Sequence, residues 1–249
     1  HGRVTNRNQP PANPARFTAR PPVPPSPELE NYFERMRPTV DETIDRLGAA
    51  RFREDPIAGR KYSRATSIIS SAYKRHGAIL QRALLERLKD CARLRVWTED
   101  DFKLSHESLR QVRVAERLDS LLQAQLPYGD RERSARVDIM VFDEARHSIN
   151  AYNVKRGNGS YDGGKRRIIH EELVRIQMLL SDYGRGIGFV SETSHAHIIF
   201  YYGLLSLPPP LAISGDDLDE HFRFPVREAI EFVNAYFVAR LSALIEQED

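Results

Sequence analysis

The 249-residue chain has little cysteine and little charge imbalance, because it contains one cysteine, Cys91, and carries a net charge of only +2. A single cysteine cannot form a disulfide within the chain, which predicts a reducing, cytoplasmic setting and excludes disulfide-stapled secreted scaffolds. No apolar run reaches the ~18 residues of a membrane helix, so we expect no membrane partner. The small net charge also excludes nucleic-acid binding through bulk charge, so any such surface requires local clusters of Lys and Arg.

The composition divides the chain into three zones. Residues 1–27 form a proline- and arginine-rich segment that favours an extended conformation and predicts either a flexible tail or an arm across a partner subunit or a nucleic-acid backbone. Residues 28–64 predict an N-terminal helical extension. Residues 65–249 contain enough apolar sequence for one core that ends in a C-terminal helix.

Apolar periodicity predicts most of the regular elements. In chain order we expect helices over 26–37 and 39–47, an irregular connection over 51–64, a helix over 65–93, a short strand over 94–97 with a turn over 98–101, a helix over 105–125, a helix over 165–183, strands over 186–191 and 196–202, and a helix over 226–246.

The stretch from Arg136 to Glu172 predicts a β-hairpin followed by a helix. Two runs with strand alternation, 137–142 and 148–155, are joined by a short polar turn, which is typical of antiparallel pairing. Residues two apart on a strand share a face, so Asn153 and Lys155 point the same way, and with suitable register Asp138 lies beside them.

This constellation resembles the core of the PD-(D/E)XK nuclease superfamily over roughly 67–203. The matching residues are Asp138 in RVDIMV and Lys155 in YNVKRG, while the preceding helix carries GAILQ, with Gln81, in place of the family's G-x-x-x-E. The resemblance implies an α/β fold with an αβββαβ core, in which helices flank a mixed sheet. It also implies that carboxylates beside the lysine bind Mg²⁺, with Mn²⁺ as a substitute, and activate water against a DNA phosphodiester.

Two positions depart from the family pattern, because amides occupy places that are usually acidic. Asn153 stands at the second acid and Gln81 at the helix acid, and Mg²⁺ prefers carboxylates. The sequence leaves three interpretations open: an acid drawn from elsewhere, a non-cleaving relative, or acids neutralised on purpose. Under the first, the metal ligands would be Asp138, Asn153 and Glu172, of which Glu172 is favoured over Glu171 because it shares a helix edge with the expected buried residues Ile168, Ile169 and Ile176.

Basic residues around the hairpin are the candidates for contact with DNA phosphates, and these are Arg156, Lys165, Arg166 and Arg167. The leading hypothesis is a Mg²⁺-dependent endodeoxyribonuclease of the restriction, repair or defence type, which would place it near the nucleoid. The alternative is a non-catalytic DNA-binding or assembly subunit on the same fold, and a third is a helical scaffold whose hairpin motif is accidental. A homodimer or larger assembly would use the N-terminal arm or the C-terminal helix.

Overall fold

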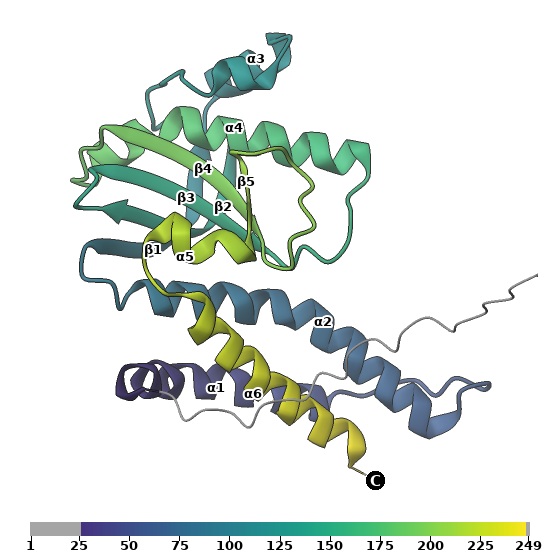
Figure 1. Ribbon diagram of the computed structural model, residues 1–249. Helices are drawn as coiled ribbons and strands as arrows, with labels where there is room; N and C mark the ends of the chain where they lie inside the picture. The colour runs from purple at the N-terminus through teal and green to yellow at the C-terminus, as the bar shows by residue number, and fades with distance from the viewer. Residues whose placement is uncertain (1–25, 248–249) are drawn as a thin grey trace, which may run out of the picture.

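The computed structural model describes residues 26–247 as an α/β protein in which helices cover both faces of a five-stranded mixed sheet (Figure 1). All but the last two residues of the predicted arm lie outside this described range. The elements are α1 Pro27–Ala49, α2 Gly59–Leu88, β1 Leu94–Leu104, α3 His106–Val114, η1 Leu118–Leu121, β2 Arg133–Asp143, β3 Ser148–Lys155, α4 Gly163–Gly186, β4 Thr193–Phe200, β5 Ala212–Ser214, η2 Gly215–Asp217, α5 Leu218–Phe222 and α6 Arg227–Glu246.

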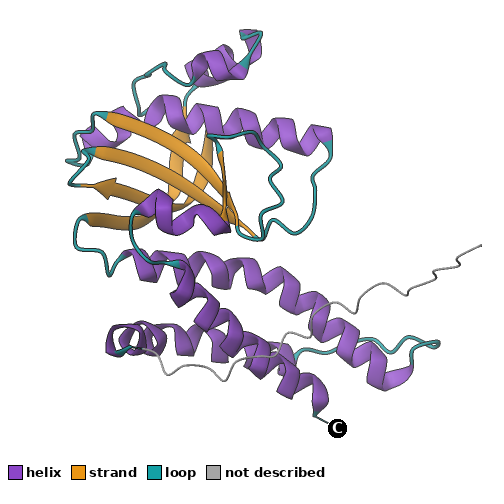
Figure 2. Cartoon of the chain, in the orientation of Figure 1, coloured by secondary structure: helices purple, strands orange, loops and turns teal. Residues whose placement is uncertain are grey.

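The sheet runs in the order β1-β2-β3-β4-β5. The pairs β1–β2 and β2–β3 are antiparallel, whereas β3–β4 and β4–β5 are parallel. The parallel pair β3–β4 requires a crossover, which α4 supplies by returning the chain over one face of the sheet (Figure 2). The predicted hairpin of 137–142 and 148–155 is therefore confirmed as the antiparallel pair at the centre of the sheet.

Two apolar layers hold the helices to the sheet. On one face, α4 buries Leu173, Ile176 and Leu180 against strand residues that include Met140 and Ile198. The opposite face packs against α2 and α5, and α1 and α6 pack behind α2 (Figure 1). The apolar residues of the last helix, α6, thus pack within the chain, against α1 and α2.

The predicted break in the first helix at Pro38 is wrong, because α1 continues through this proline. Proline inside a helix costs about 3 kcal/mol, because it removes a hydrogen bond and clashes with the preceding turn. Tyr32, Met36 and Val40 flank Pro38 at four-residue spacing and are fully buried, and the Tyr32 hydroxyl donates to the Ala83 carbonyl of α2 at 2.9 Å. Tertiary packing on both sides of the proline offsets its local cost.

Three other predicted boundaries are corrected by tertiary contacts. β1 does not turn at 98–101 but continues to Leu104, because Phe102 and Leu104 both enter the core. The helix expected over 105–125 ends at Val114, after which the chain bends so that the leucines of η1 pack beside α4. The strand expected over 186–191 is instead the turn and loop that follow the last residue of α4, Gly186, with Gly188 at φ +96° and a hydrogen bond from Phe189 N to Gly184 O.

The remaining differences are smaller. α2 begins at Gly59 and ends at Leu88, so it includes part of the connection that was expected to be irregular. The short elements β5 and α5 lie in a region where no element was expected. Within residues 26–247, no helix has the length and apolar character that a membrane span requires.

Candidate nucleic-acid interface

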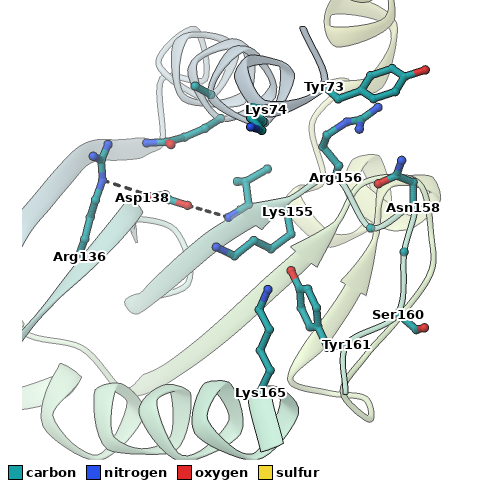
Figure 3. Close-up of a pocket in the computed structure, with 16 residues that line it drawn as sticks. Tyr73, Lys74, Arg136, Asp138, Lys155, Arg156, Asn158, Ser160, Tyr161 and Lys165 are labelled. Carbon is teal, nitrogen blue, oxygen red and sulfur yellow. Dashed lines mark hydrogen bonds and ion pairs between the residues drawn. The ribbon is translucent and has the colours of Figure 1, made fainter. Parts of the chain in front are cut away.

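An open cavity of about 630 Å³ lies where the β2–β3 hairpin meets α2 and the glycine-rich loop before α4 (Figure 3). α2 contributes one wall, the end of the hairpin forms the floor, and the loop and first turn of α4 close the far side. The lining residues are Tyr73, Lys74, Gly77, Ala78, Gln81, Arg136, Asp138, Val154, Lys155, Arg156, Gly157, Asn158, Gly159, Ser160, Tyr161 and Lys165.

The floor forms because the backbone ladder between β2 and β3 stops short of the cavity. The last paired residues on this side are Ile139 and Tyr152. Beyond them two side chains join the strands: Asn153 Oδ1 accepts from Asp138 N at 3.0 Å, and Asp138 Oδ2 accepts from Val154 N at 2.9 Å. Each side chain satisfies a backbone donor of the other strand, so the hairpin stays closed where direct pairing has ended.

A β-bulge on the other side of β2 also fixes Asp138. The pairs Trp97–Met140 and Glu99–Val137 span two residues on β1 but three on β2, so β2 carries an extra residue around Asp138. The Thr98 hydroxyl donates to the Asp138 carbonyl at 3.1 Å. Bulges redirect side chains, and this one places the Asp138 carboxylate at the cavity instead of within a continuous strand face.

The cavity has a strong excess of positive charge. Its charged side chains are five cations, Lys74, Arg136, Lys155, Arg156 and Lys165, against one carboxylate, Asp138. Arg136 is the only one of the five with an ion pair among the described residues, to Asp138 at 3.5 Å and Asp100 at 3.7 Å. Clustered cations in a concave site focus a positive potential, and this raises the local concentration of polyanions.

Aromatic rings hold two of the cations in place. Lys165 Nζ lies 4.1 Å from the centroid of Tyr161, and the guanidinium carbon of Arg156 lies 5.0 Å from that of Tyr73 (Figure 3). Burial raises the pKa of the Tyr161 phenol, so the ring stays neutral at ordinary pH. Such cation–π contacts orient a long side chain while its charged end stays accessible to a ligand.

The donor set does not complete a Mg²⁺ site. Among residues 26–247, Asp138 is the only carboxylate that lines the cavity, and it is engaged by Val154 N and Arg136. The Asn153 oxygen already accepts from a backbone donor. Within the described part of the chain, no cluster of three or more His, Cys, Asp or Glu side chains is arranged to hold a metal. Mg²⁺ usually requires one or two available carboxylates, so these residues do not fit a resident ion.

The structure brings together most of the predicted site residues but not all of them. Asp138, Lys155, Gln81, Arg156 and Lys165 line one cavity, and Asn153 contacts Asp138 beside it. Of the three residues predicted as metal ligands, Asp138 and Asn153 lie side by side, whereas Glu172 does not line this cavity.

The three predicted residues on α4 other than Lys165 lie elsewhere. Glu172 forms an ion pair with Arg133 at 3.0 Å and does not line the cavity, so it is not positioned as the substitute acid. Arg167 pairs with Glu171 at 3.0 Å, and Arg166 donates to the Tyr161 carbonyl. Of the residues assigned to the buried face of α4, Ile176 is 1% exposed as expected, whereas Ile168 is 64% exposed, because the first turns of the helix are not covered by the core.

Sequence reasoning missed the contribution of α2 to the cavity. Gln81 was assigned to the site from the sequence and neither Tyr73 nor Lys74 was, yet both line the cavity. A signal was present, because Lys74 and Gly77 precede Gln81 by seven and four residues, the spacing of one helix face. Once Gln81 is assigned to the site, helical periodicity assigns Lys74 to it as well.

Comparisons with protein-family models, with curated proteins and with solved structures found no match to this chain. The resemblance to the PD-(D/E)XK nucleases therefore stays a prediction from the sequence.

Proposed function

We propose that this chain binds the backbone of DNA at the cavity between α2 and the hairpin, and that it does so without cleaving it. The observation that carries the proposal is the charge of the cavity, where five cations surround one engaged carboxylate. Lys and Arg contacts to phosphate supply most of the affinity of a nucleic-acid interface and do not depend on base sequence.

The order of the elements supports a relation to the nuclease fold. α2, β1, β2, β3, α4 and β4 follow one another in the αβββαβ order of the PD-(D/E)XK core, with α3 and η1 inserted between β1 and β2. Asp138 and Lys155 lie on adjacent strands and line the same cavity, as the catalytic acid and lysine of that superfamily do. A non-cleaving relative would keep this surface for DNA while losing the metal-binding acids.

Metal-dependent cleavage of DNA is the second candidate, and the shared cavity of Asp138, Lys155 and Gln81 favours it. It differs from the first candidate in needing acids that the cavity lacks. Restoring the acid at position 153 is therefore the change that separates the two.

The test incubates supercoiled plasmid with the chain and with its Asn153→Asp variant, each with Mg²⁺ or Mn²⁺ and each with a chelator. We expect the unaltered chain to shift the plasmid on a gel without nicking it under either condition. Metal-dependent nicking by the unaltered chain would favour the nuclease instead. No shift and no nicking by either protein would contradict both candidates and favour a helical scaffold or assembly role.

A further inference from the structure

Arg156 differs from the other cations of the cavity because its guanidinium is held on several sides. Its Nε donates to His76 Nδ1 of α2 at 3.1 Å. Its guanidinium carbon lies 5.0 Å from the ring centroid of Tyr73 and 5.8 Å from that of Tyr202, whose phenol it also contacts. Among residues 26–247, no carboxylate lies within ion-pair distance of it, so none of its N–H donors has an anionic partner there.

His76 is itself fixed from the opposite side. Its Nε2 lies 2.8 Å from Asn234 Oδ1 of α6, and its ring stacks on Phe237, with centroids 5.6 Å apart and planes at 10°. The side chain is 6% exposed. The amide oxygen of Asn234 requires a proton on Nε2, whereas the Nε–H of Arg156 requires a lone pair on Nδ1. One neutral tautomer satisfies both contacts.

The neutral state of His76 is the one that burial favours, because burial lowers the pKa of its imidazole and Arg156 lowers it further. A protonated ring could not accept from Arg156 and would repel it. The α6–α2 packing thus presents a hydrogen-bond acceptor to an arginine at the rim of the cavity.

A guanidinium held in this way is suited to a phosphate group. Arginine presents its donors in a planar fork that matches two phosphate oxygens. An arginine side chain that is already fixed in place loses less conformational freedom on binding. We propose that His76 is a positioning residue, which fixes Arg156 so that the terminal amino groups meet one backbone phosphate of the bound DNA. This inference rests on the proposed function.

The test compares two variants that lose the imidazole ring equally but keep different polar atoms. In His76→Asn the amide oxygen lies near the former Nδ1 and still accepts from Arg156. In His76→Gln the amide reaches the former Nε2 and keeps the contact with Asn234 but not the one with Arg156. Both variants are made also in an Arg156→Gln background. Affinity for a duplex DNA oligonucleotide is measured by fluorescence anisotropy over a range of salt concentrations, and thermal unfolding shows that each variant is folded.

We expect His76→Gln to bind DNA about tenfold more weakly than the unaltered chain, with the log–log salt slope reduced by about one phosphate ion pair. His76→Asn should stay within about threefold of the unaltered chain. Neither substitution should weaken binding further in the Arg156→Gln background, because His76 acts through Arg156. A merely structural role for His76 would instead weaken both variants alike and add to the effect of Arg156→Gln.

Two results would overturn the inference and leave the proposed function intact. One is full affinity and salt slope in His76→Gln while Arg156→Gln weakens binding. The other is a nitrogen NMR spectrum in which His76 carries its proton on Nδ1, which is a readout that needs no DNA. Absence of DNA binding by the unaltered chain would overturn the proposed function together with the inference.

Discussion

The side-chain oxygen of Asn153 accepts a hydrogen bond from the backbone N–H of Asp138 at 3.0 Å. The side chain of Asn153, which the resemblance to the nuclease superfamily would place at the second acid, therefore joins two strands. The Asp138 carboxylate makes the reciprocal contact with Val154 N at 2.9 Å, so both residues serve the hairpin as well as the cavity. Substitution of either residue should therefore affect both the stability of the hairpin and the charge at the cavity.

Asn153→Asp should keep the strand contact, because a carboxylate oxygen also accepts from Asp138 N, but it places two negative charges side by side. Without metal we expect the melting temperature to fall by about 2–4 °C, which corresponds to about 1 kcal/mol for a chain of this size. Added Mg²⁺ or Mn²⁺ should restore it, because two adjacent carboxylates bind these ions. Differential scanning fluorimetry with and without metal measures both effects.

Asn158→Asp is the matched control, because Asn158 also lines the cavity but lies on the loop away from Asp138. It makes the same change of charge in the same cavity. We expect no metal-dependent stabilisation in this variant. Equal stabilisation of both variants by metal would show that the ion does not bind specifically between positions 138 and 153, and would contradict the prediction.

Asp138→Asn and Asp138→Ala should separate the structural role of Asp138 from its charge. The amide oxygen of Asp138→Asn still accepts from Val154 N, so stability should change little. Asp138→Ala leaves that N–H without its acceptor, and the free energy of unfolding should fall by about 1–3 kcal/mol. Urea denaturation measures this difference.

The same two variants also test the proposed function. Both remove the one negative charge of the cavity, so each should bind DNA more tightly than the unaltered chain by about twofold to fivefold. Weaker DNA binding by the folded Asp138→Asn variant would contradict a purely electrostatic cavity and favour a direct role for the carboxylate.

The hairpin was predictable because its residues form a local pattern, in which strand alternation is interrupted by a short polar turn between Phe142 and Ser148. The path of β1 beyond Trp97 was not predictable in the same way. The acids at 99–101 indicate a turn locally, but the burial of Phe102 and pairing with β2 carry the strand through them. Long-range pairing therefore outweighed the local signal.

The residues of the site were likewise predictable where local patterns place them, and not where long-range packing does. Asp138, Lys155 and Gln81 could be assigned to one place from a hairpin and a helix face. The placement of Glu172 and Arg167 outside the cavity, each in an ion pair with a neighbouring side chain, depends on how α4 packs on the sheet. The contact between Arg156 and His76 joins residues 80 positions apart, and no spacing rule predicts it.

The salt dependence of DNA binding should distinguish the cations of the cavity from those beside it. Lys155 and Lys165 line the cavity, whereas Arg166 and Arg167 do not, and both arginines have partners within the chain. Replacing both lysines by glutamine should reduce the log–log slope of affinity against salt by about 1.8, because each ion pair with a phosphate contributes about 0.9 to that slope.

Replacing Arg166 and Arg167 by glutamine is the control, since it removes the same charge from the same region. We expect it to leave the slope nearly unchanged in anisotropy titrations. A larger effect from the arginine pair than from the lysine pair would move the DNA surface along α4 and away from the cavity.

Acid should destabilise the fold through two histidines on the sheet face opposite α4. Burial lowers the pKa of His197 to about 3 and that of His221 to about 4, from an ordinary value of 6.5. His197 lies 2.8 Å from the Pro210 carbonyl and His221 lies 2.7 Å from the Tyr152 hydroxyl, and burial favours the neutral form of both rings. Between these pKa values and 6.5, the two histidines are protonated in the unfolded chain but neutral in the folded chain. Their protonation therefore does not lower the free energy of unfolding well above about pH 6.5, and it lowers it progressively as the pH falls towards about 4.

At about pH 5 each of these histidines should lower the free energy of unfolding by about 2 kcal/mol relative to neutral pH, because one pKa unit corresponds to about 1.4 kcal/mol. Urea denaturation at about pH 7.5 and about pH 5 measures the total decrease in stability. His221→Gln keeps a polar partner for Tyr152 but cannot be protonated, so it should recover roughly half of the decrease that the pair causes. An equal decrease in the unaltered chain and in His221→Gln would show that this histidine is not held neutral in the fold, and that the acid sensitivity arises from carboxylates such as those that pair with arginine.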